Sequence, residues 1–186
     1  YFTDKAIHTM PLPALKKGRN ELLVKAPIGK RVSLENYFLL GDFGVRVTGC
    51  EAVITKKPEK LAFGSVVSQG LPFYGANITY KLPLDVTSDG DLVVRSELYR
   101  GALIGARLDG EEVGHIVFSP YILKIPDVKK GAHTLELTLF GTRQNSFGAL
   151  HNCSHAKWQG PDYWYSGGIS WAYEYQLSDM GSHKSP

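Results

Sequence analysis

The densest group of side chains that could bind a ligand lies near the carboxyl end of the chain. Residues 152 to 168 hold Trp158, Tyr163 and Trp164 among glycine, proline and aspartate. Flat aromatic rings bury the apolar C–H faces of sugars, and Asn, Asp, Arg and His side chains bind the surrounding hydroxyls. Rings on a long irregular loop are explained as core less readily than rings on a strand. The segment is therefore a candidate carbohydrate-binding loop.

The candidate binding residues come from this loop and from the polar cluster at its start. They are Trp158, Asp162, Tyr163, Trp164, Arg143, Asn145 and His151. Two alternatives stay open. The rings could cap one end of the fold or pack against a neighbouring domain, since exposed aromatics also mark protein interfaces. The polar residues could order the loop by hydrogen bonds. Trp171, Tyr173 and Tyr175 are expected in the core or on a sheet face.

Acidic residues suggest no complete active site. A glycosidase needs two carboxyl groups facing each other across a pocket. The acidic residues near aromatic ones are Asp42, Asp109, Glu111, Glu112, Asp162 and Glu174, and none belongs to a motif that selects it as acid or nucleophile. Asp109 and Asp162 are better explained as turn residues. We expect no catalysis by the chain alone, although it could lend a residue to a neighbouring active site.

The histidines and cysteines predict no metal centre. His151-x-x-x-His155 brackets Cys153, but a fourth ligand is not evident, so surface or hydrogen-bonded histidines are favoured. Cys50 and Cys153 are expected to be free and buried, although the sequence leaves a disulfide between them open. Phosphate-binding glycine loops are absent, and no cofactor is predicted.

Composition excludes two classes of partner. The net charge is +3, which is too small to indicate nucleic acid or an anionic membrane surface. No apolar run approaches the roughly 20 residues of a membrane span. A hydrophobic content of 43% with 20 glycines and 10 prolines fits a globular chain with many turns.

The elements that must position these residues are short β-strands. Asp109-Gly110 between two apolar-rich runs predicts a hairpin of residues 102–108 and 112–118, because a type I′ turn needs positive φ at both central positions. Leu135, Leu137 and Leu139 alternate with polar residues, which predicts one buried face. The segment from Tyr80 to Val86 alternates in the same way. The fold class is thus all-β, an antiparallel jelly-roll β-sandwich.

The domain organisation follows from the turn residues. Residues 63–178 are predicted to form the sandwich, and 179–186 a frayed tail. Residues 1–58 should contain strands that end a preceding sandwich or complete the main one. Expected strands outside the centre are 21–25, 31–40, one starting at 45, and a closing strand at 169–177. No convincing helix is present, and the longest candidate, residues 120–128, carries two prolines.

Two similar segments of the sequence suggest an internal repeat. Lys16-Lys17-Gly18 precedes Leu22 much as Lys129-Lys130-Gly131 precedes Leu135. One interpretation is two related sandwiches in tandem, which predicts the same inward face for Leu22 and Leu135. The other is chance, because such turns are common.

The central motifs resemble a known family. The run Phe73–Tyr80, the hairpin Asp109–Gly114 and the turn and strand Gly131–Leu135 are similar to the galactose-binding-like jelly roll, including the sugar-binding domain of family 2 glycoside hydrolases. The segment Leu34–Gly44 resembles carboxy-terminal regions of bacterial polysaccharide-degrading enzymes, including α-L-rhamnosidase-like ones. About two thirds of the chain takes part.

The resemblance implies a non-catalytic carbohydrate-binding or accessory module of a larger polysaccharide-degrading glycoside hydrolase. Its partners would be carbohydrate and the catalytic domain of the parent enzyme, in a secreted, periplasmic or cell-surface bacterial protein. A structural calcium ion is common in that family, but no Asp-rich loop places one here. Two alternatives remain: an architectural docking module that binds no sugar, and a fragment lending residues to a neighbouring glycosidase site.

Overall fold

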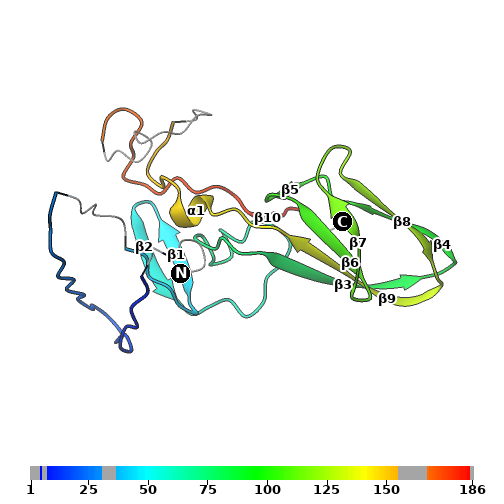
Figure 1. Cartoon of the computed structure of the whole chain (residues 1–186), viewed down its shortest axis with the longest axis horizontal. Helices are drawn as coiled ribbons and strands as arrows, with labels where there is room; N and C mark the ends of the chain where they lie inside the picture. Colours follow the sequence, from blue (N-terminus) through cyan, green and yellow to red (C-terminus); the bar gives the residue numbers. More distant parts are fainter. Residues whose placement is uncertain (1–4, 6–7, 31–36, 155–166, 185–186) are drawn as a thin grey trace. The chain divides into compact units, whose positions relative to one another are not determined.

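The computed structural model describes residue 5 and residues 8–30, 37–154 and 167–184 (Figure 1). The chain divides into two units, Tyr1–Leu40 and Gly41–Pro186. The described residues of the first unit form no strand or helix, and all of them are exposed. Asn20 closes a turn there, because its amide accepts from the Lys16 N–H at 2.9 Å and donates to the Lys16 carbonyl at 2.8 Å. This unit therefore has no packed core among its described residues.

The second unit holds a β-sandwich of antiparallel strands. One sheet has the strand order β3-β9-β6-β7, and the facing sheet has the order β4-β8. Successive strands mostly alternate between the two sheets, which is the wrapping expected of a jelly roll. The strands are β3 (Ile78–Val86), β4 (Gly90–Arg95), β6 (Ile104–Leu108), β7 (Glu111–Ile116), β8 (Ile122–Val128) and β9 (Gly131–Leu139). The predicted all-β antiparallel sandwich is confirmed.

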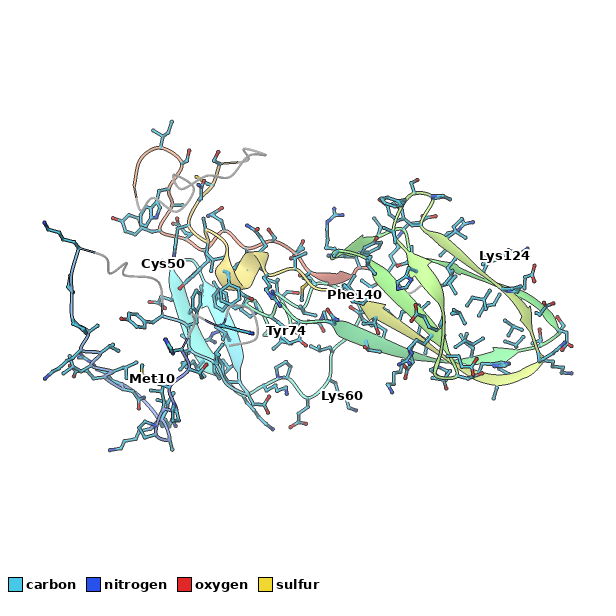
Figure 2. The ribbon with its side chains drawn as sticks, viewed as in Figure 1. Met10, Cys50, Lys60, Tyr74, Lys124 and Phe140 are labelled. Atoms are coloured by element: carbon cyan, nitrogen blue, oxygen red, sulfur yellow. The ribbon has the colours of Figure 1, made fainter. Side chains whose placement is uncertain are left out.

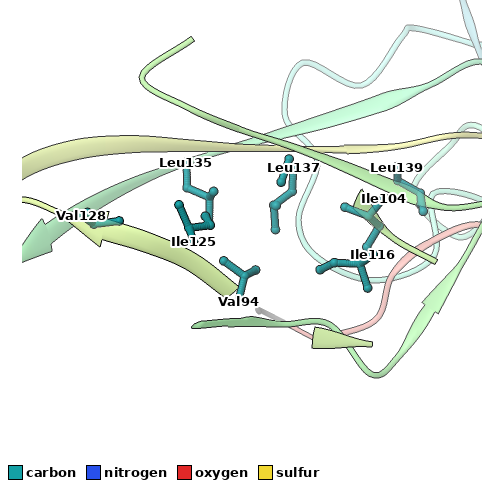
Figure 3. Packing of buried hydrophobic residues seen from close by; sticks show 9 residues of the cluster. Val94, Ile104, Ile116, Ile125, Val128, Leu135, Leu137 and Leu139 are labelled. Carbon is teal, nitrogen blue, oxygen red and sulfur yellow. The ribbon is translucent and has the colours of Figure 1, made fainter. Parts of the chain in front are cut away.

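The core lies between these two sheets. Leu135, Leu137 and Leu139 on β9 are 3%, 3% and 0% exposed, which confirms the buried face that alternation predicts. Figure 3 shows these leucines directed toward side chains of the facing sheet. The remaining buried members of the cluster are Val94, Ile104, Ala106, Ile116, Ile125 and Val128. Each strand thus buries one face, as an antiparallel sandwich requires.

The hairpin around Asp109-Gly110 is also confirmed. β6 pairs with β7 antiparallel, and Leu108 lies opposite Glu111 across a two-residue turn. The φ angles of Asp109 and Gly110 are 52° and 90°, which are the positive values that the turn chemistry requires. Residues 120–128, the longest candidate for a helix, lie largely in strand β8.

Smaller elements complete the second unit. A separate two-stranded antiparallel sheet joins β1 (Gly44–Thr48) to β2 (Glu51–Thr55), so the strand expected from residue 45 is present. Residues 63–72 form a loop that precedes β3. The single helix among the described residues, α1 (Gln144–Phe147), is one turn long. No helix among these residues has the length and apolar character needed to cross a membrane.

Three expected strands need correction or fall outside the described residues. Residues 21–25 are exposed and unpaired, because no partner strand covers their apolar face. Residues 31–36 lie outside the described part, and 37–40 form no strand. The closing strand at 169–177 is wrong: only Trp171 makes an isolated bridge, to Asn152, and Ile169 is fully exposed. Alternating aromatics therefore do not mark a regular strand here.

The closing strand lies instead in the predicted frayed tail. β10 (Gly181–Ser182) pairs antiparallel with β5 (Tyr99–Arg100). Residues 64 and 66 donate backbone hydrogen bonds to Ser182 and Met180 on the other side, at 2.6 and 2.8 Å. Gly181 has φ +143°, and a Cβ there would lie 2.0 Å from the Gly64 carbonyl oxygen. The backbones approach this closely only because the residue is glycine.

Two further expectations are corrected. Leu22 is 63% exposed whereas Leu135 is 3% exposed, so the two do not share an inward face and the tandem repeat is not supported. Cys50 and Cys153 are free, as expected, but both are exposed rather than buried. Cys50 lies in the tight turn between β1 and β2, where a two-stranded sheet offers no interior.

Candidate functional site

Residues 140–154 and 167–180, here named the loop-rich end, form the candidate site. Two segments distant in sequence run side by side through irregular backbone hydrogen bonds. The N–H of Ala172 donates to the His151 carbonyl at 2.7 Å, and the N–H of Gln176 donates to the Leu150 carbonyl at 2.6 Å. The N–H of Cys153 donates to the Ser170 carbonyl at 2.8 Å. These bonds place the side chain of His151 beside residues 171–175.

Five rings make a continuous series of contacts, here named the aromatic row. Centroid distances are 5.5 Å from Phe73 to Tyr175, 4.8 Å from Tyr175 to His151, 5.7 Å from His151 to Trp171 and 4.6 Å from Trp171 to Tyr173. Two of the contacts are edge-to-face, a favoured geometry for aromatic pairs. Tyr173 at the end of the row is 74% exposed, and the other four rings are half-buried. Each ring of the row is therefore supported by at least one neighbouring ring while the row presents ring surface to solvent.

His151 adds a polar group to this row. Its Nδ1 lies 3.1 Å from the Ala172 carbonyl oxygen, so Nδ1 must carry the proton that the bond uses. In the neutral imidazole, Nε2 is then an acceptor. Within the described residues Nε2 makes no hydrogen bond. A half-buried ring with an available acceptor, flanked by two aromatics, suits a hydroxyl-bearing ligand.

The other sequence-predicted polar residues take different places. Asn145 is 4% exposed, and its amide is engaged with the backbone of Ser178, donating to the carbonyl at 2.8 Å and accepting from the N–H at 2.9 Å. Arg143 is exposed and immediately precedes α1. Asn145 thus orders the loop-rich end, which is one of the two roles left open for it, and His151 is the member brought together with aromatic rings.

Four predicted binding residues, Trp158, Asp162, Tyr163 and Trp164, lie outside the described residues, as does His155. The aromatic row contains four residues that were not predicted to bind a ligand: Phe73, Trp171, Tyr173 and Tyr175. The last three were expected in the core or on a sheet face, but they lie outside any strand, and Tyr173 is exposed. One feature of the sequence could have indicated these residues: several aromatic residues follow Gly167-Gly168 closely. Paired glycines argue against a regular strand, so aromatic residues beside them are less readily explained as sheet residues. Because no strand forms at 169–177, these rings do not pack on a sheet face and can instead contact one another.

Asp109 is a structural turn residue, as predicted. Its Oδ1 accepts from the Thr134 N–H at 2.7 Å, and its Oδ2 lies 2.6 Å from Nδ1 of His133. These hydrogen bonds hold the pKa of Asp109 below its ordinary value, and the bond from the Thr134 backbone contributes more than the bond from His133. Asp42 pairs with Lys57 at 2.5 Å, and Glu112 lies 3.7 Å from His115. In the described part of the chain, no three His, Cys, Asp or Glu residues are grouped to hold a metal ion.

Comparisons with known proteins gave one structural likeness. The chain is similar to a small part of a rhamnosidase from Novosphingobium sp. PP1Y, with a TM-score of 0.42 and 19% sequence identity. The alignment covers 86% of this chain and 16% of the rhamnosidase chain, so this chain spans less than a fifth of that protein. No protein-family model matches the sequence, and no curated protein matches it.

Proposed function

We propose that this chain is a non-catalytic carbohydrate-binding module of a larger polysaccharide-degrading enzyme. The observation that carries the proposal is the aromatic row, a continuous series of partly exposed rings at the loop-rich end. Ligand-binding residues concentrate on loops positioned by a rigid scaffold, and the sandwich supplies that scaffold. The rings of Trp171 and Tyr173 would stack on sugar C–H faces, and Nε2 of His151 would accept a hydrogen bond from a hydroxyl.

The proposal also keeps Trp158, Asp162, Tyr163, Trp164 and Arg143 as sugar-binding residues. The hydrogen bond between Cys153 and Ser170 closes the base of the segment that contains the first four. Partners of the module would be carbohydrate and the catalytic domain of its enzyme, and its location would be secreted, periplasmic or at a bacterial cell surface. One aromatic stack contributes about 1 kcal/mol. Binding through two or three such contacts would therefore be weak, with a Kd on the order of ten millimolar.

The test is titration of plant and bacterial oligosaccharides followed by tryptophan fluorescence and amide shifts. Trp171→Ala and Tyr173→Ala should each weaken binding by roughly 5- to 10-fold, which is the scale of one aromatic contact. Phe118→Ala is the matched control, because Phe118 is an aromatic residue 81% exposed on the sandwich. Binding that is unchanged in both row variants but lost on Ala at Trp158 and Trp164 would place the sugar on the loop alone. The absence of binding by every sugar tested would overturn the proposal.

A second candidate is an architectural module that docks to a neighbouring domain. It is favoured by exposed aliphatic residues in the second unit, which add nothing to sugar stacking. Ile169 is fully exposed, and Val53 and Ile54 on β2 are 44% and 47% exposed. Exposed apolar side chains such as these are covered when a neighbouring domain packs on them. Protection of these three residues from solvent in the full-length enzyme, together with no sugar binding by the module, would favour this alternative.

A further inference from the structure

The segment that carries three rings of the aromatic row continues into the tail of the chain. Trp171, Tyr173 and Tyr175 belong to residues 171–175, and residues 180–183, here named the tail strap, begin five positions later. Figure 1 shows this part of the chain, coloured orange to red, running from the loop-rich end to β5. The way in which the strap is held therefore bears on where the rings lie.

The backbone around the rings is bonded to turns. The N–H of Tyr175 donates to the Gly49 carbonyl at 3.1 Å, and the N–H groups of Ala172 and Gln176 donate to the carbonyls of residues 150–151. Gly49 lies in the turn between β1 and β2, and residues 150–151 lie in a turn that follows α1. These bonds tie the row to other irregular backbone and not to a strand of the sandwich.

The tail strap is bonded on both of its sides. Residues 64–66 donate two backbone hydrogen bonds to one side, at 2.6 and 2.8 Å. Residues 98–100 hold the other side, through the antiparallel pairing of β5 with β10 and through a bond of 2.8 Å from the N–H of His183. Met180 and Ser182 are 3% and 4% exposed. The strap is thus buried and held on two sides, as a central strand of a sheet is.

The partners of the strap belong to the sandwich. The N–H of Ser182 donates to the hydroxyl oxygen of Tyr80 at 3.0 Å, and Tyr80 lies on β3. The ring of Phe63 stacks on Tyr80 with centroids 5.0 Å apart and planes 7° from parallel, which supports the ring that carries this hydroxyl. Tyr80 and Tyr99 of β5 both pack against the buried apolar cluster. The strap therefore connects the segment of the row to the core of the sandwich.

Glycine is required at the centre of the strap. The φ of Gly181 is +143°, and an added Cβ would lie 2.0 Å from the Gly64 carbonyl oxygen. A larger residue must move the strap away from residues 64–66, because a backbone carbonyl does not yield as a flexible side chain does. Six positions separate Gly181 from Tyr175, so a displaced strap lies close to the row in the chain.

We propose that Gly181 and Tyr80 are positioning residues for the aromatic row. They fix the tail strap to the sandwich, and the strap holds residues 171–175 where a sugar stacks on their rings. This role rests on the proposed sugar binding of the row. The coupling is reciprocal, since a ligand that binds better when the strap is attached also stabilises the attached strap. Sugar binding should therefore slow hydrogen exchange at the amide of Ser182, although Ser182 lies outside the row.

The first test is Gly181→Ala in the full chain. The amides of residues 182–183 should exchange about tenfold faster, the equivalent of one or two lost hydrogen bonds. The indole N–H signal of Trp171 should shift, and binding of the plant and bacterial oligosaccharides should weaken by about fivefold, the scale of one aromatic contact. Gly90→Ala is the matched control, because Gly90 has no positive φ and no atom lies within 4 Å of the added Cβ.

Tyr80→Phe is the second variant and decides the question should the first fail to fold. It keeps the stacked ring but removes the hydroxyl that accepts from Ser182. The Ser182 amide should exchange about threefold faster, the scale of one hydrogen bond, and the Trp171 signal should shift in the same direction. Tyr74→Phe is the matched control, because this tyrosine, labelled in Figure 2, donates its hydroxyl to the Asn77 carbonyl within its own loop, at 3.0 Å.

Three results would overturn the proposal. In the first, the strap amides exchange faster while the Trp171 signal and the sugar affinity stay unchanged, so the strap does not hold the row. In the second, exchange of the strap amides is unchanged in both variants. In the third, β9 amides lose protection to the same degree, so the row responds to a weakened sandwich. If no sugar binds the natural chain, the proposed function fails, and the Trp171 signal still decides whether the strap positions the row.

Discussion

The sandwich strands and the loop-rich end are held together by different forces. The facing sheets bury nine apolar residues in one cluster that runs from Val94 to Leu139. The described residues of the loop-rich end are tied mainly by polar contacts. Asn145 bonds twice to the Ser178 backbone, the Ser146 hydroxyl donates to the Phe73 carbonyl at 2.8 Å, and His151 bonds to the Ala172 carbonyl. A regular core lies beside an irregular, polar scaffold.

The contrast explains why the loop-rich end suits a binding site. Apolar burial stabilises a structure in proportion to the area removed from water, and it leaves few groups for a ligand. Side-chain-to-backbone bonds instead fix individual residues while neighbouring rings remain partly exposed. Tyr173 is 74% exposed although its ring contacts Trp171 at 4.6 Å. The loop-rich end thus combines order with accessible surface.

The largest expected effect is in the sandwich. Leu137→Ala would leave a cavity at a position only 3% exposed, between the two sheets. Such substitutions cost about 2–5 kcal/mol of the free energy of unfolding. Ile169→Ala in the loop-rich end is the control, because a fully exposed side chain should change stability by less than about 0.5 kcal/mol. Chemical denaturation of both variants makes the measurement, and similar losses in the two would remove the contrast.

A smaller loss is expected at the polar tie of the loop-rich end. Asn145→Ala would remove both hydrogen bonds to the Ser178 backbone, made by an amide that is only 4% exposed. Leaving buried polar groups unpaired costs about 1–3 kcal/mol. Asn145→Asp keeps an acceptor for the N–H but sets a carboxylate against the carbonyl, so it should rescue little. Hydrogen exchange of the Ser178 amide should rise in both variants.

A rise confined to the loop-rich end, with β9 amides still protected, would show that this end opens separately from the sandwich. If β9 amides lose protection to the same degree, the two regions unfold as one cooperative unit. That result would show that the polar scaffold of the loop-rich end is not stabilised separately from the apolar core.

Sequence periodicity predicted the sandwich because its stabilising pattern is local. Leu135, Leu137 and Leu139 share a face because side chains of a strand alternate with a two-residue repeat. The dipeptide Asp109-Gly110 predicts its turn from two adjacent residues. The loop-rich end depends on partners far apart in the chain. Asn145 meets Ser178, and Leu150 meets Gln176, without any repeat that marks them. Periodicity therefore suggested a closing strand at 169–177 where none forms.

The candidate site was predicted in part for the same reason. His151 was identified because polar residues cluster around it in sequence, and the structure places it within the aromatic row. Phe73 is 78 positions away from His151, and only the fold connects the two through Tyr175. The tail was expected to fray because it is small and polar. Glycine at 181 instead permits the close backbone approach that forms β10.

The smallest expected effect on stability concerns the pair His133 and Asp109 within the sandwich. His133 on β9 lies with Nδ1 2.6 Å from Oδ2 of Asp109 and Nε2 2.8 Å from the Lys129 carbonyl oxygen. Both partners are acceptors, so the ring must carry both protons to make both bonds. The Asp109 carboxylate first, and then the Lys129 carbonyl, raise the pKa of His133 above its ordinary 6.5.

This pair should give the sandwich a pH dependence with a definite sign. A raised folded-state pKa stabilises the fold below the unfolded value of about 6.5, and that contribution is lost as pH rises through the folded pKa. The lowered pKa of Asp109 acts oppositely: its contribution is present above about 3.8 and is lost as pH falls through the folded value. The pair should therefore contribute most between about pH 4 and 6.5.

The measurement is the free energy of unfolding from pH 4 to 9 for the natural chain, His133→Asn and Asp109→Asn. Asp109→Asn keeps an Asn-Gly turn and an acceptor for the Thr134 N–H while removing the charge, so it isolates the ion pair from the turn. Relative to the natural chain, both variants should lose most stability below pH 6.5 and little above the folded pKa of His133. A difference that stays constant with pH would show that His133 binds as a neutral ring. The polar tie would then act through its geometry alone, as Asn145 does in the loop-rich end.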